Sequence, residues 1–154
     1  NPDQRAIWQD DIDGVTATAV DEIVRMASPV TYMRRTVTRP LTLSGQDFET
    51  GDRLIMFYGA ANRDPRVFDD PERFDVRRDP NPHVGFGGPG PHFCLGAHLA
   101  RRELAVVFRQ ILTRLPDIEV TGSPDFLDSL GPPLVGGVKR LPVRFTPTAR
   151  IGAG

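Results

Sequence analysis

Hydrophobic residues recur at helical spacing in two segments of the chain, and a proline follows each segment. In the first, the apolar side chains fall on one face of a helix that Pro29 stops; they are Val20, Ile23, Val24 and Ala27. The second stripe ends before Pro116 and consists of Leu99, Leu104, Val107, Phe108, Ile111, Leu112 and Leu115. We therefore predict a helix over residues 17–26 and a longer one over residues 95–115, each packing one face on a core.

The rest of the chain has the shorter apolar runs of strands and loops. Residues 29–64 and 118–147 alternate apolar and polar positions between turn residues, which predicts short strands in both segments, two or three of them in the second. Residues 64–92 contain six prolines and have no sustained period, as is typical of a long irregular segment. We expect it to be ordered, because apolar residues can anchor it at Val67, Phe68, Phe74, Val76 and Val84. The predicted fold class is α+β, mainly α with short β-sheets.

Composition narrows the class of protein. Hydrophobic residues make up 39% of the chain and charged residues 25%, as in globular domains, and 154 residues suffice for one domain with a core. The formal net charge of −1 gives no electrostatic reason to expect a nucleic-acid partner. No apolar run approaches the roughly 18 residues of a membrane span, and the first residues lack the layout of a signal peptide. We expect a soluble, cytoplasmic protein without a membrane span.

The only cysteine of the chain, Cys94, lies directly before the second predicted helix. The free N–H groups and the positive dipole end of a helix N-terminus stabilise an anion, so this position favours a thiolate. Glycines on both sides of the thiol let a broad, flat group approach the backbone; they are Gly87, Gly88, Gly90 and Gly96.

Four interpretations of this thiol are open from the residues alone. Cys94 could be a small buried apolar residue in a tight turn. It could share a metal ion with His92 and His98, although their spacing is not that of common zinc sites. As a nucleophile it would need one of these histidines as its base, and nothing in the sequence supplies a third group to orient the base. It could also be the thiolate ligand of a haem iron.

The stretch GPHFCLG, residues 90–96, followed by AHLARREL, resembles the Cys-ligand loop and the following helix of the cytochromes P-450. The family pattern is Phe, two residues, Gly, one residue, His or Arg, one residue, Cys, one residue, Gly. It is matched by Gly90, His92, Cys94 and Gly96. The aromatic position differs, because Phe86 lies one residue further upstream and Gly87 stands in its place. In this respect the loop resembles the variant found in a bacterial branch of the family that acts on sterols and methyl-branched lipids.

Three further motifs resemble the family in the expected order. Glu22 and Arg25 match its Glu-x-x-Arg helix motif, whose spacing puts both side chains on one helix face. DPERFD, residues 70–75, resembles the meander motif, whose arginine, here Arg73, completes a buried network with these two residues. RRTVTRPLTLSG, residues 34–45, resembles a strand that reaches under the haem and places Arg35 at a propionate. The resemblance covers residues 17–145.

The resemblance implies a haem b cofactor with Cys94 as the axial ligand of the iron. The cofactor-binding residues that it carries over are Cys94, His92, Arg35, Phe86, Gly87, Gly88, Gly96 and Ala97. A thiolate ligand favours O–O cleavage, and the N–H groups of Leu95 and Gly96 would tune its electron donation. The implied activity is a monooxygenase that takes electrons from a ferredoxin or flavoprotein and acts on a small apolar substrate, with a sterol or branched lipid as the candidate.

The resemblance also implies that residues 1–154 correspond to the C-terminal part of such a domain. The chain has no AGxxT-like stretch, so the central helix that delivers protons to bound oxygen is missing from it. We expect this chain alone to bind haem weakly, and not to hydroxylate a substrate at a useful rate without the N-terminal part. The candidate substrate contacts are Val30, Tyr32, Met33, Leu134 and Val135. The alternative function is a non-catalytic haem-binding or sensing module.

Overall fold

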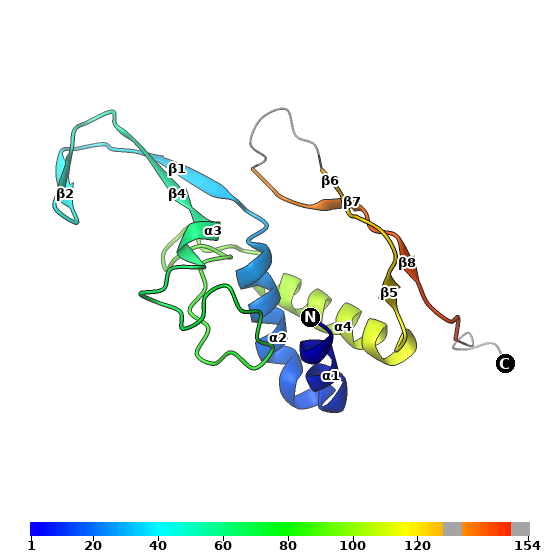
Figure 1. The fold of residues 1–154 in the computed structure, drawn as a ribbon. Coiled ribbons are helices and arrows are strands. Elements are labelled where there is room, and N and C mark those ends of the chain that lie inside the picture. The colour runs from blue at the N-terminus through cyan, green and yellow to red at the C-terminus, as the bar shows by residue number, and fades with distance from the viewer. Residues whose placement is uncertain (128–133, 149–154) are drawn as a thin grey trace.

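The computed structural model describes residues 1–127 and 134–148, and Figure 1 shows helices gathered in one group from which paired strands extend as narrow ribbons. The helices are α1 (Pro2–Asp10), α2 (Ile12–Ala27), α3 (Tyr58–Ala61) and α4 (Ala97–Arg114). The strands are β1 (Tyr32–Thr36), β2 (Leu41–Leu43), β3 (Gln46–Phe48), β4 (Arg53–Phe57), β5 (Glu119–Val120), β6 (Asp125–Phe126), β7 (Val138–Arg140) and β8 (Val143–Arg144). Within the described residues, no helix is both long and apolar enough to cross a membrane.

Both predicted helices are confirmed, and the first is longer than predicted. Helix α2 starts at Ile12 because the side chain of Asp11 caps it, accepting a hydrogen bond from the Gly14 N–H at 2.8 Å. It ends where Ser28 adopts a left-handed conformation, with φ of 38°. Helix α1 was not predicted, because it buries only Gln4 and Trp8 and so has no continuous apolar stripe. Its local signal is Pro2 in the first turn, a favoured helix-start position.

The hydrophobic core lies where α1, α2 and α4 meet the irregular segment over residues 64–92. It consists of Trp8, Val15, Ala19, Val76 and Leu112. The Trp8 ring stacks on Phe108 of α4 with centroids 5.3 Å apart, and its indole N–H donates to the Thr16 hydroxyl. Val76 and Phe68 are buried, as predicted for anchors of this segment, whereas Val67 is 55% exposed and was wrongly predicted as one.

The strands pair only as antiparallel couples among the described residues, as β1–β4, β2–β3, β5–β8 and β6–β7. The predicted strands are thus present, with four rather than two or three after residue 118. On α4 the predicted stripe is only partly buried, because Leu99 and Val107 are 62% and 51% exposed while Leu112 is buried. The contact of α4 with α2 and the core therefore uses one part of its apolar surface and leaves another part open.

Candidate functional site

Cys94 stands on the loop that leads into α4. Its side chain is exposed, and its backbone N–H donates to the Phe86 carbonyl at 3.0 Å. Its own carbonyl accepts from the N–H of Ala97, the first residue of α4, so the thiol lies at the N-terminal opening of this 18-residue helix. Helix N-termini in general carry unpaired N–H groups and the positive end of the helix dipole, which attract a nearby anion.

Two glycines of the loop are required by its backbone. Gly87 has φ of +87° and Gly90 φ of +134°, conformations that residues with a side chain rarely adopt. A Cβ on Gly87 would also lie 3.7 Å from the His92 carbonyl oxygen and 3.9 Å from the Tyr58 hydroxyl. The backbone conformation of this loop therefore requires glycines at these positions, in addition to any space that they leave for a bound group.

A cavity of about 470 Å³ lies between this loop and the β1–β4 strand pair. Arg35 of β1 lines this cavity together with His92, Gly87 and Gly88, so four of the predicted cofactor-binding residues from distant segments share one site. The remaining wall is mostly apolar and comes from the end of β4, α3 and the loop: Met56, Phe57, Tyr58, Ala61, Val84, Pro89, Gly90 and Pro91.

The other predicted cofactor-binding residues lie beside this cavity rather than in its wall. Cys94 and Gly96 follow on the same loop, and a Cβ on Gly96 would lie 3.9 Å from the Cys94 sulfur. Phe86 is half-buried, with its ring next to His83 and Arg101. Ala97 is fully buried at the start of α4, so its side chain is turned to the protein interior.

The donor set of this region fits a haem. A haem combines a flat apolar ring, an iron that accepts a sulfur ligand and two carboxylates. The region offers an exposed thiol, glycines where no side chain obstructs, and the exposed cationic Arg35 in the same cavity wall as His92. Within residues 1–127 and 134–148, by contrast, no three His, Cys, Asp or Glu side chains are grouped so as to hold a metal ion.

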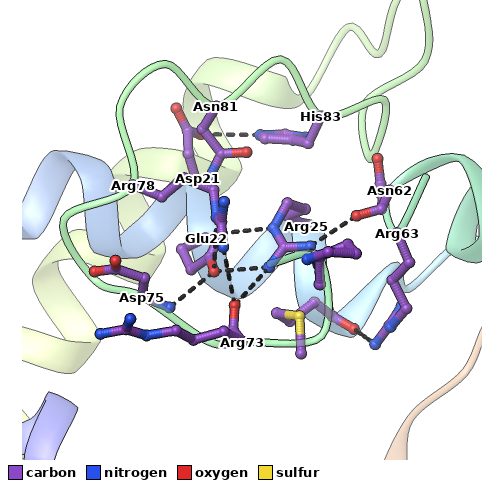
Figure 2. A network of polar contacts seen from close by, with 12 residues as sticks. Asp21, Glu22, Arg25, Asn62, Arg63, Arg73, Asp75, Arg78, Asn81 and His83 are labelled. Carbon is purple, nitrogen blue, oxygen red and sulfur yellow. Dashed lines mark hydrogen bonds and ion pairs between the residues drawn. The ribbon is translucent and has the colours of Figure 1, made fainter. Parts of the chain in front are cut away.

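Glu22 and Arg25 form a completely buried ion pair on α2 (Figure 2). Arg25 Nε lies 2.7 Å from Glu22 Oε2, and Arg25 Nη2 lies 2.8 Å from Oε1, so the pair is bidentate. The remaining donors of Arg25 reach backbone carbonyls of Asn62, Pro71 and Arg73 at 2.7–3.0 Å. One side chain of α2 thus ties together α3 and the irregular segment.

The prediction that the Arg73 guanidinium completes this network is corrected by these contacts. Arg73 is exposed and takes part through its carbonyl, because its N–H closes a turn onto the Asp70 carbonyl and directs the side chain outward. The third charged group is Arg78, whose Nε lies 3.2 Å from the Glu22 carboxylate. Asn81 and the backbone N–H of Asp75 also donate to Glu22 (Figure 2).

The electrostatic balance at Glu22 favours the carboxylate. Burial by itself raises the pKa of Glu22, but hydrogen bonds from Arg25, the Asp75 N–H and Arg78 outweigh it, and the pKa falls below its ordinary value. Sequence reasoning missed Arg78 and Asn81. Their place in the sequence could have indicated them, because they follow closely after Val76 and burying Val76 brings this segment back to α2.

The predicted substrate contacts come together at the foot of β1. Val30 and Val135 form an isolated antiparallel bridge, and the Thr31 N–H donates to the Leu134 carbonyl at 3.0 Å. Tyr32 opens β1 with its ring 6.4 Å from that of Phe57. Met33, Leu134 and Val135 are 36%, 49% and 53% exposed, so this group presents apolar side chains outward.

Comparisons with known proteins agree with this geometry. Residues 4–129 match the family model described as Cytochrome P450. The chain is 50% identical over 145 residues to the methyl-branched lipid omega-hydroxylase of Mycobacterium tuberculosis, covering 94% of this chain and 33% of that protein. It is 45% identical over 129 residues to the steroid C26-monooxygenase of the same organism, covering 84% and 29%. A solved Mycobacterium marinum cytochrome P450 in complex with pseudoionone superimposes with a TM-score of 0.87 at 44% identity, covering 94% of this chain and 34% of that one. The chain therefore spans about a third of the length of these relatives.

Proposed function

Because this chain belongs to the cytochrome P450 family, we propose that residues 1–154 form the C-terminal, haem-binding part of a haem-thiolate monooxygenase. The enzyme would insert one oxygen atom of O2 into an apolar substrate. The observation that carries this proposal is the exposed Cys94 thiol at the N-terminus of α4, on a glycine-rich loop whose adjacent cavity holds Arg35 and His92.

Each of these residues has a role set by its chemistry. Haem b, when bound, supplies the activation of O2. Cys94 would be its sulfur ligand, kept as thiolate by the helix N-terminus and by the N–H groups of Leu95 and Gly96. Arg35 and His92 would hold its carboxylates by charge-assisted hydrogen bonds, the strong kind. Glu22, Arg25 and Arg78 would hold the surrounding backbone in place.

The substrate that we propose is a sterol or a methyl-branched lipid. Two relatives are named for hydroxylating these classes, and they are 50% and 45% identical to this chain. The apolar group at the foot of β1 suits such a molecule, since Met33, Leu134 and Val135 present hydrophobic surface.

The electron donor that we propose is a ferredoxin or a flavoprotein docking near the start of α4. Arg102 is exposed there and could meet an acidic partner, where charge governs the association rate more than the final affinity. Arg101 is less suited to this role, because its Nε already lies 2.7 Å from Asp21.

The test uses the full-length protein that contains these residues. We expect the reduced protein to give a strongly red-shifted Soret band with carbon monoxide, and to hydroxylate a sterol or methyl-branched lipid when given a donor and O2. Absence of the red-shifted band would contradict the proposal. A red-shifted band without product from either lipid class would favour the non-catalytic haem-binding module instead.

Replacing Arg35 or His92 by leucine should speed the loss of haem. Each change removes a charge-assisted hydrogen bond to a carboxylate, so we expect the dissociation rate to rise about tenfold or more. The rate is measured by transfer of haem to an excess of a haem-free acceptor protein. The matched control is Arg34→Leu on the same strand, because consecutive residues of a strand face opposite sides and Arg34 is outside the cavity wall. Unchanged retention in both Arg35→Leu and His92→Leu would refute the assignment.

A further inference from the structure

Three segments that are far apart in the sequence meet at Asp21, the residue before the buried Glu22. Arg101 of α4 places its Nε 2.7 Å from Asp21 Oδ1, and His83 of the irregular segment places its Nε2 3.3 Å from the same oxygen. The His83 side chain is only 3% exposed, while those of Asp21 and Arg101 are 31% and 34% exposed. Figure 2 shows His83 beside Asp21 at the margin of the Glu22 network.

The hydrogen bonds of His83 define how its ring is used. Its Nδ1 accepts from the Gly85 N–H at 3.1 Å, so the other nitrogen, Nε2, carries a proton and donates to Asp21. The adjacent backbone is held against α2, since a Cβ on Gly85 would lie 2.5 Å from a methyl carbon of Val24. His83 therefore holds the irregular segment against α2, just before this segment continues into the loop that carries Cys94.

Phe86 connects this cluster to the thiol. Its ring lies 5.8 Å from the His83 ring, and the Arg101 guanidinium lies over it at 4.6 Å from the centroid. The carbonyl of the same residue accepts the backbone N–H of Cys94 at 3.0 Å. His83 and Arg101, the two partners of the Asp21 carboxylate, thus both contact Phe86. The Phe86 carbonyl in turn accepts the hydrogen bond from the backbone N–H of Cys94.

From these contacts we propose that Asp21 is a positioning residue for Cys94, acting through His83, Arg101 and Phe86. The inference rests on the proposed function only in taking Cys94 as a ligand. Asp21 touches neither the thiol nor the adjacent cavity. It orients the cationic and aromatic groups that set where the loop backbone presents the sulfur, as outer partners commonly orient metal ligands.

The chain offers a matched control for this proposal. Asp13 of α2 pairs with Arg109 of α4, eight residues before Asp21 and eight after Arg101. The two ion pairs join the same two helices, and only the Asp21 pair also bonds to the segment that leads into the Cys94 loop. Asp21→Ala and Asp13→Ala therefore each remove one ion pair between the helices, but only the first releases the loop.

The first test follows haem in the full-length holoprotein. We expect Asp21→Ala to lose haem about tenfold faster than the wild type, the lower end of the usual effect of removing an outer partner of a metal ligand. The fraction of the reduced carbon monoxide complex without the red-shifted Soret band should also rise, and Asp13→Ala should leave both quantities unchanged. Wild-type values for Asp21→Ala, or equal changes in the two variants, would overturn the proposal.

The second test needs no haem and so separates this proposal from the proposed function. The rate at which a maleimide modifies Cys94 is measured on the haem-free protein by mass of the peptide that contains it. Asp21→Ala should change this rate severalfold while Asp13→Ala does not, and an unchanged rate overturns the proposal. Should Asp21→Ala not fold, Asp21→Asn replaces it, because the amide keeps the shape and loses the charge that holds Arg101.

Discussion

Replacing Cys94 by alanine in the full-length protein is expected to abolish the red-shifted Soret band of the reduced carbon monoxide complex. That band reports a thiolate on the haem iron, and Cys94 is the only thiol that this chain can supply. The side chain is exposed, and the loop is held by the Cys94 N–H and carbonyl, which alanine retains. The change should therefore remove the ligand and leave the fold intact.

Two measurements accompany this prediction. Circular dichroism of the Cys94→Ala protein should match the wild type, because residues 97–114 stay helical when the core contacts of Phe108 and Leu112 are untouched. A variant with the wild-type spectrum would show that another group ligates the iron. Loss of both the spectrum and the helical signal would instead assign Cys94 a structural role.

Replacing Glu22 by alanine is expected to cost about 3–5 kcal/mol of unfolding free energy, as when one partner of a buried ion pair is removed. Arg25 would keep its position at 0% exposure while losing its bidentate partner, and Arg78 would lose its anion. The measurement is denaturant unfolding of the full-length protein. The control is Glu119→Ala, which breaks an exposed pair with Arg144 and should cost no more than about 1 kcal/mol. Similar small losses in both variants would contradict the buried network.

The Glu22 contribution should also depend on pH with a defined sign. The folded-state pKa of Glu22 lies below its ordinary value, so the unfolded chain binds the proton first as pH falls. The stabilisation is then fully present above the unfolded-state pKa and is lost as pH drops through the folded-state pKa. The stability difference between the wild type and Glu22→Gln should shrink over that acidic range, and a difference that does not change there would exclude an ionised Glu22.

The sequence by itself determined those features of this protein that depend on residues close together in the chain. Apolar spacing identified α2 and α4, and turn residues with alternation identified the strand regions. The Cys94 loop and the Glu22–Arg25 motif were recognisable because their residues lie within a few positions of one another. The family assignment rested on these short motifs, and the comparisons confirm it.

Only the tertiary structure decided which distant groups meet. It assigned the third charge at Glu22 to Arg78 instead of Arg73, because the turn closed by the Arg73 N–H on the Asp70 carbonyl directs Arg73 outward. It brought Arg35 to His92 across one cavity, and His83 and Arg101 to one oxygen of Asp21. The physical reason is that periodicity records which face of an element is apolar, whereas the partner of a buried charge depends on how the irregular chain turns to reach it.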